Sequence, residues 1–365
     1  MPSSKYYDIQ DDLVIDSQTE EYTRTICTAK LNAAKKIEKL YAKGDLRYGD
    51  YKCTYIVPSG MNAIYLCLNT IYEINKKNKN DITFMFSSEL YEDTEELIIN
   101  NLIDKNVNII RFDQTSLEDF KNKKNNNHID CVFVESCSNP SGLMTDWNIF
   151  KYCDNDTIKI VDNTWLSPVS FNPFLCGSNI VVESCTKYIS GGKCIAGHIT
   201  FNEYNWLTDL IENEIEISGS HVSPINCKII DEMIDSIEER IKISSLKTTQ
   251  ILDKLKLNPK IKNIKYPYQM IHNKKYKYPP SVMYLNIETD SPILFGDSYK
   301  EHVKEIIKLA GLYNHTSYGK IYDTINNLKD SDINNESVWL RLSIGYNIID
   351  VDILHEKLEK IINDI

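Results

Sequence analysis

The sequence predicts an α/β protein in which a mainly parallel sheet is flanked by helices and is followed by a smaller C-terminal α/β domain. Short apolar runs alternate with helical stretches over the first part of the chain, which is the pattern of a parallel sheet covered on both faces. At 365 residues the chain exceeds the size of one ordinary core. From about residue 224 the pattern changes to a long helix and a second set of elements.

Apolar runs and amphipathic stretches define the elements of the first unit. Helical periodicity covers residues 60–75, and a further helix is expected around residues 94–104. Buried strands are expected where short apolar runs are bounded by turn residues, at 81–87, 107–112, 130–136, 157–163 and 180–182. Asn- and Lys-rich pieces between them are typical of solvated turns. In a sheet of this kind ligands bind at the carboxyl ends of the strands.

A second unit follows the first. One long helix is expected over residues 229–256, and a connection rich in Tyr and Pro comes after it. The remaining pattern predicts two strands and two helices, at 281–288, 298–311, 337–345 and 351–364. We therefore expect an N-terminal arm and helix that contact another subunit, a large cofactor-binding domain and a small C-terminal domain, over residues 1–50, 51–237 and 238–365.

Composition excludes several classes of protein. The 41 basic and 52 acidic residues give a formal charge of −11, which repels nucleic acid. No apolar run approaches the roughly 18 residues that span a bilayer, and the acidic start has no signal-peptide pattern, so we expect a cytoplasmic protein without a membrane partner. Ten cysteines without C-x-x-C spacing favour a reducing compartment and no metal site.

Two polar residues follow buried strands and are candidates for chemistry. Taken alone, Asp162 is an ordinary turn or cap residue and Lys187 an ordinary solvated lysine. Together they match what pyridoxal phosphate requires, which is a lysine that forms a Schiff base and a carboxylate that pairs with the pyridinium nitrogen. Partial burial beside other cations would lower the pKa of Lys187, and Gly191 and Gly192 give the following loop room to adjust.

The remaining needs of such a cofactor are met by residues near strand and helix ends. The sequence predicts a phosphate cradle at a helix start, where Ser59, Gly60 and Met61 present backbone N–H groups, although the same pattern also describes an ordinary N-cap. Two hydroxyls flank the lysine, those of Ser184 and Thr186. Tyr91 follows a strand and is placed to lie flat on a planar ring, or to pack against the next helix.

Eight short motifs resemble, in order, the Cys/Met-metabolism family of pyridoxal phosphate enzymes, which includes cystathionine γ-synthase, the cystathionine β- and γ-lyases, methionine γ-lyase and the homoserine sulfhydrylases. The resemblance covers nearly the whole chain and implies a fold-type I transferase fold. Its motifs are YTR (22–24), SGM (59–61), LYEDT (90–94), ESCSNP (135–140), VDNTW (161–165), SCTKY (184–188), SGSHVSP (218–224) and WLRLSIG (339–345).

The resemblance also implies roles for single residues. Lys187 would hold the cofactor and later move protons, Tyr91 would stack on the ring and act as an acid, and Arg341 would bind the substrate α-carboxylate with Ser317 beside it. The other cofactor contacts it implies are Tyr22 and Arg24 from a neighbouring subunit, and Ser59, Gly60, Met61, Asn139, Asp162, Ser184 and Thr186 from the same subunit. A homotetramer made of two active dimers is therefore expected.

The activity implied is elimination or γ-replacement on a sulfur-containing or activated-homoserine amino acid. Three alternatives stay open: β-elimination of the cystathionine β-lyase type, an aminotransferase or decarboxylase on the same scaffold, and a protein that binds the cofactor with reduced turnover. The chain departs from the family where Glu92 and Asp93 follow Tyr91, after the YTR motif, in the loop that contains Cys194, and after residue 345. These departures leave the substrate open.

Overall fold

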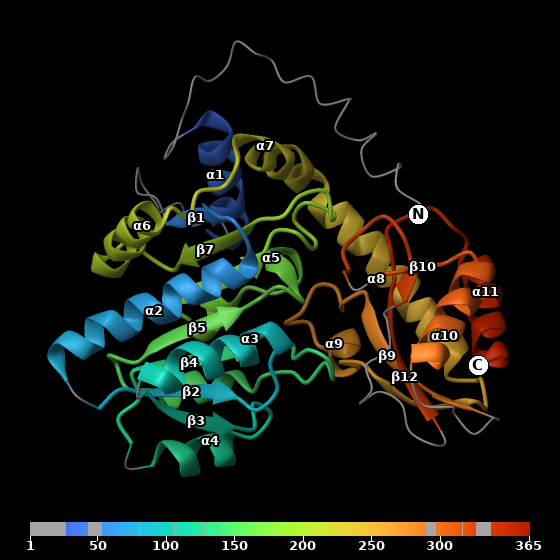
Figure 1. Cartoon of the computed structure of the whole chain (residues 1–365), viewed down its shortest axis with the longest axis horizontal. Coiled ribbons are helices and arrows are strands. Elements are labelled where there is room, and N and C mark those ends of the chain that lie inside the picture. Colours follow the sequence, from blue (N-terminus) through green and yellow to red (C-terminus); the bar gives the residue numbers. More distant parts are fainter. Residues whose placement is uncertain are drawn as a thin grey trace.

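Two sheets organise the molecule, and the helix α8 (Ile237–Leu255) runs between them (Figure 1). The computed structural model describes residues 27–42, 53–79, 81–105, 107–125, 127–289, 297–315, 317–325 and 337–365. The larger sheet is built by the first part of the chain and the smaller sheet by the C-terminal part. The α/β class and the order of two units predicted from the sequence are therefore confirmed.

The larger sheet has seven strands in the order β1-β7-β6-β5-β4-β2-β3. Four neighbouring pairs are parallel, and the strand β7 is antiparallel to both of its neighbours. The strand bounds are β1 (Thr54–Val57), β2 (Thr83–Ser87), β3 (Asn108–Phe112), β4 (Cys131–Glu135), β5 (Ile158–Asp162), β6 (Ile180–Ser184) and β7 (Gly197–Phe201). The predicted parallel strands are confirmed, whereas β1 and β7 were not expected from the sequence.

Helices cover both faces of this sheet because its strands are apolar on both sides. One face packs against α2 (Gly60–Asn78), α6 (Trp206–Ser218) and the π-helical turn that follows α3 (Glu92–Leu97). The other face packs against α1 (Thr28–Ala42), α4 (Leu117–Lys124) and α7 (Pro224–Met233), with α5 (Ser167–Ser170) at its edge.

The smaller sheet has five strands in the order β10-β11-β12-β9-β8. Their bounds are β8 (Ile261–Lys265), β9 (Val282–Glu288), β10 (Tyr313–Asn314), β11 (Thr324–Ile325) and β12 (Ser337–Ser343). One face is covered by α8, α10 (Asp297–Leu309) and α11 (Val351–Asp364), which bury leucine and isoleucine side chains against it. A short helix, α9 (Gln269–His272), lies in the connection before β9.

The single helix expected over residues 229–256 was wrong, because a 3₁₀ turn at Ile234–Ser236 separates α7 from α8. At this turn the carbonyl of Met233 accepts hydrogen bonds from the Ser236 hydroxyl and from the Arg240 guanidinium, at 3.1 and 2.8 Å. Side chains that bond the backbone in this way compete with the helical hydrogen-bond ladder. The expected domain boundary at residues 237 and 238 falls at the start of α8 and stays a prediction.

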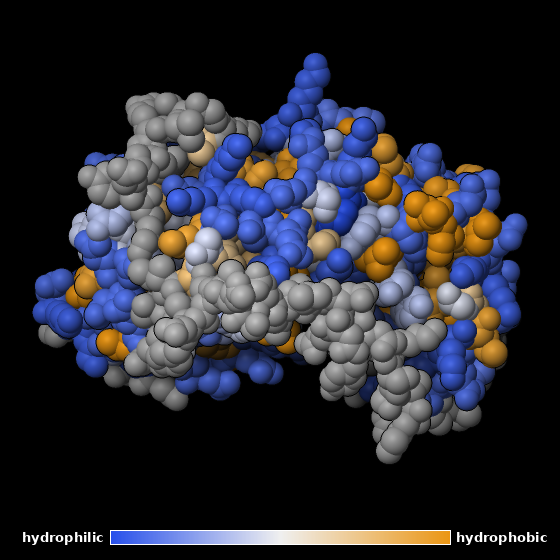
Figure 2. Space-filling model, turned by 90° about the horizontal axis from the view of Figure 1, so that it is seen from above, coloured by the Kyte–Doolittle hydropathy of each residue, from blue (hydrophilic) through white to orange (hydrophobic). Residues whose placement is uncertain are grey.

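The surface seen from the side of α1 and α7 is mainly hydrophilic, and apolar residues gather toward the C-terminal half (Figure 2). Within the described ranges, no helix combines the length and the apolar character needed to cross a bilayer. Most of the expected N-terminal arm, residues 1–26 and 43–50, lies outside the described residues.

Candidate active site

The carboxyl ends of β4, β5 and β6 bring several predicted residues to one edge of the large sheet. Asp162 ends β5 and pairs in register with Glu135 at the end of β4. Burial raises the pKa of the Asp162 carboxyl, and hydrogen bonds from Thr164, including its backbone N–H at 2.8 Å, oppose that rise. A cation placed beside this carboxylate would favour its charged form.

Glu135 was not predicted as a site residue, yet it positions two residues that were. Its carboxylate accepts the backbone N–H of Tyr91 at 2.5 Å and that of Asn139 at 3.0 Å. The side chain is buried, and burial raises its pKa well above the usual range, with the nearby Asp162 charge acting in the same direction. Glu135 thus holds the backbone of the two loops that begin at Tyr91 and at Asn139 against the end of β4.

Lys187 follows β6 and reaches toward the C-terminal part of the chain. Its Nζ donates a hydrogen bond to Ser317 Oγ at 3.0 Å and lies 5.1 Å from the centre of the Tyr318 ring. Burial lowers the pKa of Lys187 to about 8, and the charges of Arg341 and Lys320 act in the same direction. At neutral pH a useful fraction of this amine is therefore unprotonated, which is the form that acts as nucleophile and base.

The start of α2 meets the start of the lysine loop. Ser59 is the N-cap of α2, and its Oγ accepts the N–H of Asn62 at 3.0 Å. A Cβ on Gly60 would lie 2.9 Å from Ser184 Cβ, and one on Gly197 would lie 2.3 Å from Ser59 O. Only glycine permits this close approach, which leaves the outward N–H groups of the first turn beside Ser184.

The two other predicted contacts of the cradle have partners within the protein. The hydroxyl of Thr186 is hydrogen-bonded to the backbone of Ala196, to its carbonyl at 3.4 Å and from its N–H at 3.3 Å. In the first turn of α2, Met61 Sδ accepts a hydrogen bond from the Thr94 hydroxyl at 3.8 Å. These contacts place Thr186 and Met61 beside the cradle.

Arg341 and Tyr91 approach the lysine from opposite parts of the fold. Arg341 lies on β12 of the small sheet and is buried, and its charge acts on the pKa of both Lys187 and Tyr91. Burial raises the pKa of Tyr91 to about 12, with a hydrogen bond to Asp93 acting in the same direction. The Tyr91 hydroxyl therefore keeps its proton at neutral pH and is available as a proton donor.

Residues that sequence reasoning missed shape the lysine loop. Arg240 of α8 donates hydrogen bonds to the carbonyls of Tyr188 and Ile189, at 2.6 and 3.0 Å. On the other side of the loop, Lys320 Nζ lies 3.0 Å from Nε2 of His315. No local pattern in the sequence marks Arg240, His315 or Lys320, because the burial of Arg240 is visible only in the structure.

Two predicted residues, Tyr22 and Arg24, lie outside the described residues. The structure brings the others together through contacts at the edge of the large sheet, such as that of Glu135 with Tyr91 and Asn139, and through the Lys187–Ser317 hydrogen bond. Among the described residues no group of three or more His, Cys, Asp or Glu side chains is arranged to hold a metal ion.

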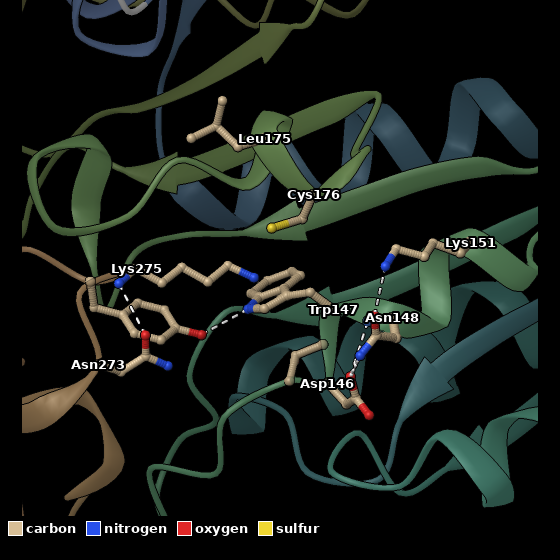
Figure 3. Close-up of a pocket in the computed structure, with 10 residues that line it drawn as sticks. Asp146, Trp147, Asn148, Lys151, Leu175, Cys176, Asn273 and Lys275 are labelled. Carbon is tan, nitrogen blue, oxygen red and sulfur yellow. Dashed lines mark hydrogen bonds between the residues drawn. The ribbon is translucent and has the colours of Figure 1, made fainter.

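A separate cavity of about 340 Å³ lies away from Lys187 and is floored by Trp147 (Figure 3). Trp147 Nε1 donates to Tyr276 Oη at 2.9 Å, and Lys275 Nζ lies 5.7 Å from the centre of the Trp147 ring. Leu175 and Cys176 lie across the cavity from these side chains. Several of the polar groups that line it bond one another, among them Asp146 with Asn148 and Asn148 with Lys151.

The chain belongs to the family of Cys/Met metabolism PLP-dependent enzymes, whose profile matches residues 3–306. Pyridoxal phosphate is therefore the cofactor of its family. The family resemblance is confirmed by this match, which includes seven of the eight motifs, all but WLRLSIG at 339–345.

Curated relatives are enzymes of the same kind at low identity. The chain is 28% identical over 216 residues to an L-methionine gamma-lyase of Fusobacterium nucleatum subsp. polymorphum, covering 57% of this chain and 52% of the relative. It is 30% identical over 243 residues to a chloroplastic mimosinase of Mimosa pudica, covering 64% and 53%. The chain spans about half the length of the curated relatives it matches.

Solved structures share the fold over nearly the full chain. A cystathionine gamma synthase from Xanthomonas oryzae pv. oryzae, solved in complex with cystathionine, superimposes with a TM-score of 0.78 at 18% identity and covers 97% of this chain and 90% of that one. A putative O-acetylhomoserine (thiol)-lyase from Campylobacter jejuni subsp. jejuni NCTC 11168, which contains N'-pyridoxyl-lysine-5'-monophosphate, superimposes with a TM-score of 0.72 at 20% identity and covers 93% and 87%. The predicted fold-type I architecture is thereby confirmed.

The described residues fit pyridoxal phosphate. The close approach of Gly60 to Ser184 places the first turn of α2 beside the end of β6, and the backbone N–H groups of a helix start suit a phosphate. The Asp162 carboxyl, whose pKa is raised by burial, would gain a partner in a protonated ring nitrogen. The half-buried amine of Lys187 follows β6, whose last residue Ser184 lies against Gly60 and whose parallel neighbour β5 ends at Asp162.

Proposed function

We propose that this protein catalyses elimination or γ-replacement on a sulfur-containing or activated-homoserine amino acid. The observation that carries the proposal is the Lys187 amine, which has a pKa lowered to about 8 and shares its surroundings with the buried Arg341. An amine of this kind beside a carboxylate-binding cation suits an α-amino acid substrate. The family of the chain supports the same conclusion.

The cofactor would be held at the edge of the large sheet. Asp162 would pair with the ring nitrogen, Tyr91 would stack on the ring, and Asn139 would lie near the ring oxygen. The phosphate would be bound by Ser59, Gly60, Met61, Ser184 and Thr186, and from a neighbouring subunit by Tyr22 and Arg24. When bound, pyridoxal phosphate supplies an electron sink for the charge left by the departing α-proton.

The residues of this chain would then share the remaining work. Arg341 binds the α-carboxylate, and Ser317, hydrogen-bonded to Lys187 at 3.0 Å, orients it. Lys187 in its unprotonated form removes the α-proton and holds it at Nζ. Tyr91 keeps its proton at neutral pH and donates it to the leaving sulfur or oxygen.

The arrangement of subunits and the compartment are also proposals. A homotetramer is supported by an apolar stripe on α6, where Trp206, Leu210 and Ile217 are 57%, 39% and 69% exposed. Residues so spaced lie on one face of a helix, and exposed apolar faces of this kind commonly contact a partner. A cytoplasmic location is supported by the ten cysteines, all of which are free thiols.

The proposed function is tested by following proton exchange in heavy water across cystathionine, methionine and O-acyl-homoserines. Exchange at both the α and β carbons, with release of a ketoacid and ammonia or formation of a thioether, is expected. Exchange at the α carbon alone with product release would instead identify β-elimination. Transfer of the amino group to an added ketoacid, or no α-exchange with any amino acid, would exclude the proposal. The control variant for these assays is Lys193→Ala, because Lys193 is an exposed lysine in the loop that follows Lys187.

A further inference from the structure

Lys320 is placed beside the catalytic lysine by the packing of its loop. A Cβ on Gly319 would lie 2.7 Å from the backbone carbonyl carbon of Lys187, so this loop lies directly on the lysine backbone. The stem of Lys320 continues past Gly192, where an added Cβ would lie 2.5 Å from Lys320 Cγ. The side chain is half-buried between these two loops, and burial lowers the pKa of its amine.

A short series of hydrogen bonds joins Lys320 to Lys187. Lys187 Nζ donates to Ser317 Oγ at 3.0 Å, and the Ser317 backbone N–H donates to His315 Nδ1 at 2.9 Å. Lys320 Nζ lies 3.0 Å from His315 Nε2 and 3.3 Å from Nδ1. Its hydrogen-bonding partner in the described part of the chain is thus an imidazole and not a carboxylate.

Cationic groups accumulate at this point of the fold. Burial lowers the pKa of His315, and the charges of Lys320, Lys187 and Arg341 act in the same direction. Half-buried like charges repel one another, and a bound anion relieves that repulsion. Asp93 is the carboxylate that acts on Lys187 in the opposite sense, but it is hydrogen-bonded with Tyr91.

The proposed function leaves one of these cations without an assigned anion. Arg341 is assigned to the α-carboxylate and Lys187 to the cofactor, whereas the phosphate cradle is formed by the start of α2. We propose that Lys320, with His315 beside it, binds a negatively charged group at the far end of the substrate side chain. This inference rests on the proposed function and narrows the substrate to amino acids with an acidic distal group.

Two amino acids without a leaving group form the matched probes. L-2-aminoadipate and L-norleucine have side chains of equal length, and they differ in ending with a carboxylate or a methyl group. Binding to the cofactor-loaded protein is measured by calorimetry and by the change in cofactor absorbance. We expect at least about tenfold tighter binding of 2-aminoadipate, since one charge-assisted contact is at stake.

Variants then assign the preference to Lys320. Lys320→Met should bring the two affinities within about twofold of each other without changing that for norleucine, and Lys320→Arg should keep most of the preference. Lys193→Met, in the facing loop but exposed, should leave both affinities unchanged. Melting temperatures of all variants show whether each is folded.

The results that would contradict these expectations each exclude a different part of the proposal. Equal affinities in the natural protein, or a preference that survives in Lys320→Met, would exclude the distal-anion site. A loss of cofactor affinity in Lys320→Met with an intact preference would make Lys320 a ligand of the cofactor phosphate instead. If neither amino acid alters the cofactor absorbance, the proposed function itself fails.

Discussion

The two sides of the candidate site are held by different interactions. The lysine wall consists of the ends of β5 and β6 with Lys187, and it is fixed by the strand ladder of the large sheet. Beneath it the fully buried Glu183 hydrogen-bonds Tyr41 and His198, at 3.0 and 3.2 Å. Burial lowers the pKa of His198 to about 3, so this network adds no positive charge at neutral pH.

The loop wall consists of His315 and residues 317–325, and side chains hold it in place. The buried Asp323 carboxylate accepts the backbone N–H of Gly345 at 2.8 Å and the Asn347 amide at 3.0 Å. It also lies 3.3 Å from Lys247 Nζ of α8. One carboxylate therefore connects the loop to two other segments.

This difference separates chemistry from selectivity. Strand ends cannot move without disrupting the core, whereas a loop fixed by a few side chains can change its contacts and leave the fold intact. We therefore expect substitutions in the lysine wall to affect every substrate alike, and substitutions in the loop wall to affect some substrates more than others.

The largest effect is expected from Arg341→Met, which removes the proposed carboxylate ligand on β12, a residue outside both walls whose charge acts on Lys187 in one and His315 in the other. kcat/KM should fall by about 100- to 1,000-fold, since truncating one partner of a buried charge pair costs about 2–5 kcal/mol. Cofactor affinity, which depends on the lysine wall, should be unchanged. Steady-state kinetics and cofactor titration measure both quantities. A fall of less than fivefold would remove Arg341 from the site.

A smaller effect is expected from breaking the anchor of the loop wall. Asp323→Ala leaves the Lys247 ammonium buried without its carboxylate, which should lower the free energy of unfolding by about 3 kcal/mol. Urea unfolding measures this change. The control is Asp253→Ala at an exposed ion pair with Lys256, where a change within about 0.5 kcal/mol is expected. Equal effects of the two variants would mean that Asp323 does not anchor the loop.

The smallest expected effect is a shift in the pH dependence of cofactor attachment, which tests whether the charge of Lys320 in the loop wall acts on Lys187 in the lysine wall. Because the pKa of Lys187 is lowered to about 8, the unprotonated fraction of its amine rises tenfold per pH unit below that value and levels off above it. The rate of cofactor attachment to the apoprotein should follow the same curve. Lys320→Met removes a like charge, so its curve should move to higher pH. Stopped-flow absorbance measures the rate. An unchanged pH curve in Lys320→Met would show that the charge of Lys320 does not affect the pKa of Lys187.

Much of the fold followed from local patterns. Strands such as β4 and β5 are short apolar runs between turn residues, and their parallel pairing follows from the helices interposed between them. The strands β1 and β7 at the edge of the sheet could not be predicted from local patterns, because they pair with each other from segments far apart in the chain. The break before α8 depends on hydrogen bonds of Ser236 and Arg240 that no periodicity reveals.

The site divides in the same way. Asp162 and Lys187 could be proposed from the sequence because each directly follows a buried strand, and such ends meet at one edge. His315 and Lys320 could not, since the loop reaches Lys187 across a sequence separation of 130 residues at Ser317. Contacts of this range depend on the path of the whole chain and not on any local motif.

The central claim is that pyridoxal phosphate is attached to Lys187. The most direct measurement is reduction of the cofactor-loaded protein with borohydride, followed by peptide mass spectrometry. We predict that the pyridoxyl mass is found on the peptide that contains Lys187 and is lost from it in Lys187→Ala. A label on Lys320, on Lys193 or on no lysine would contradict the account.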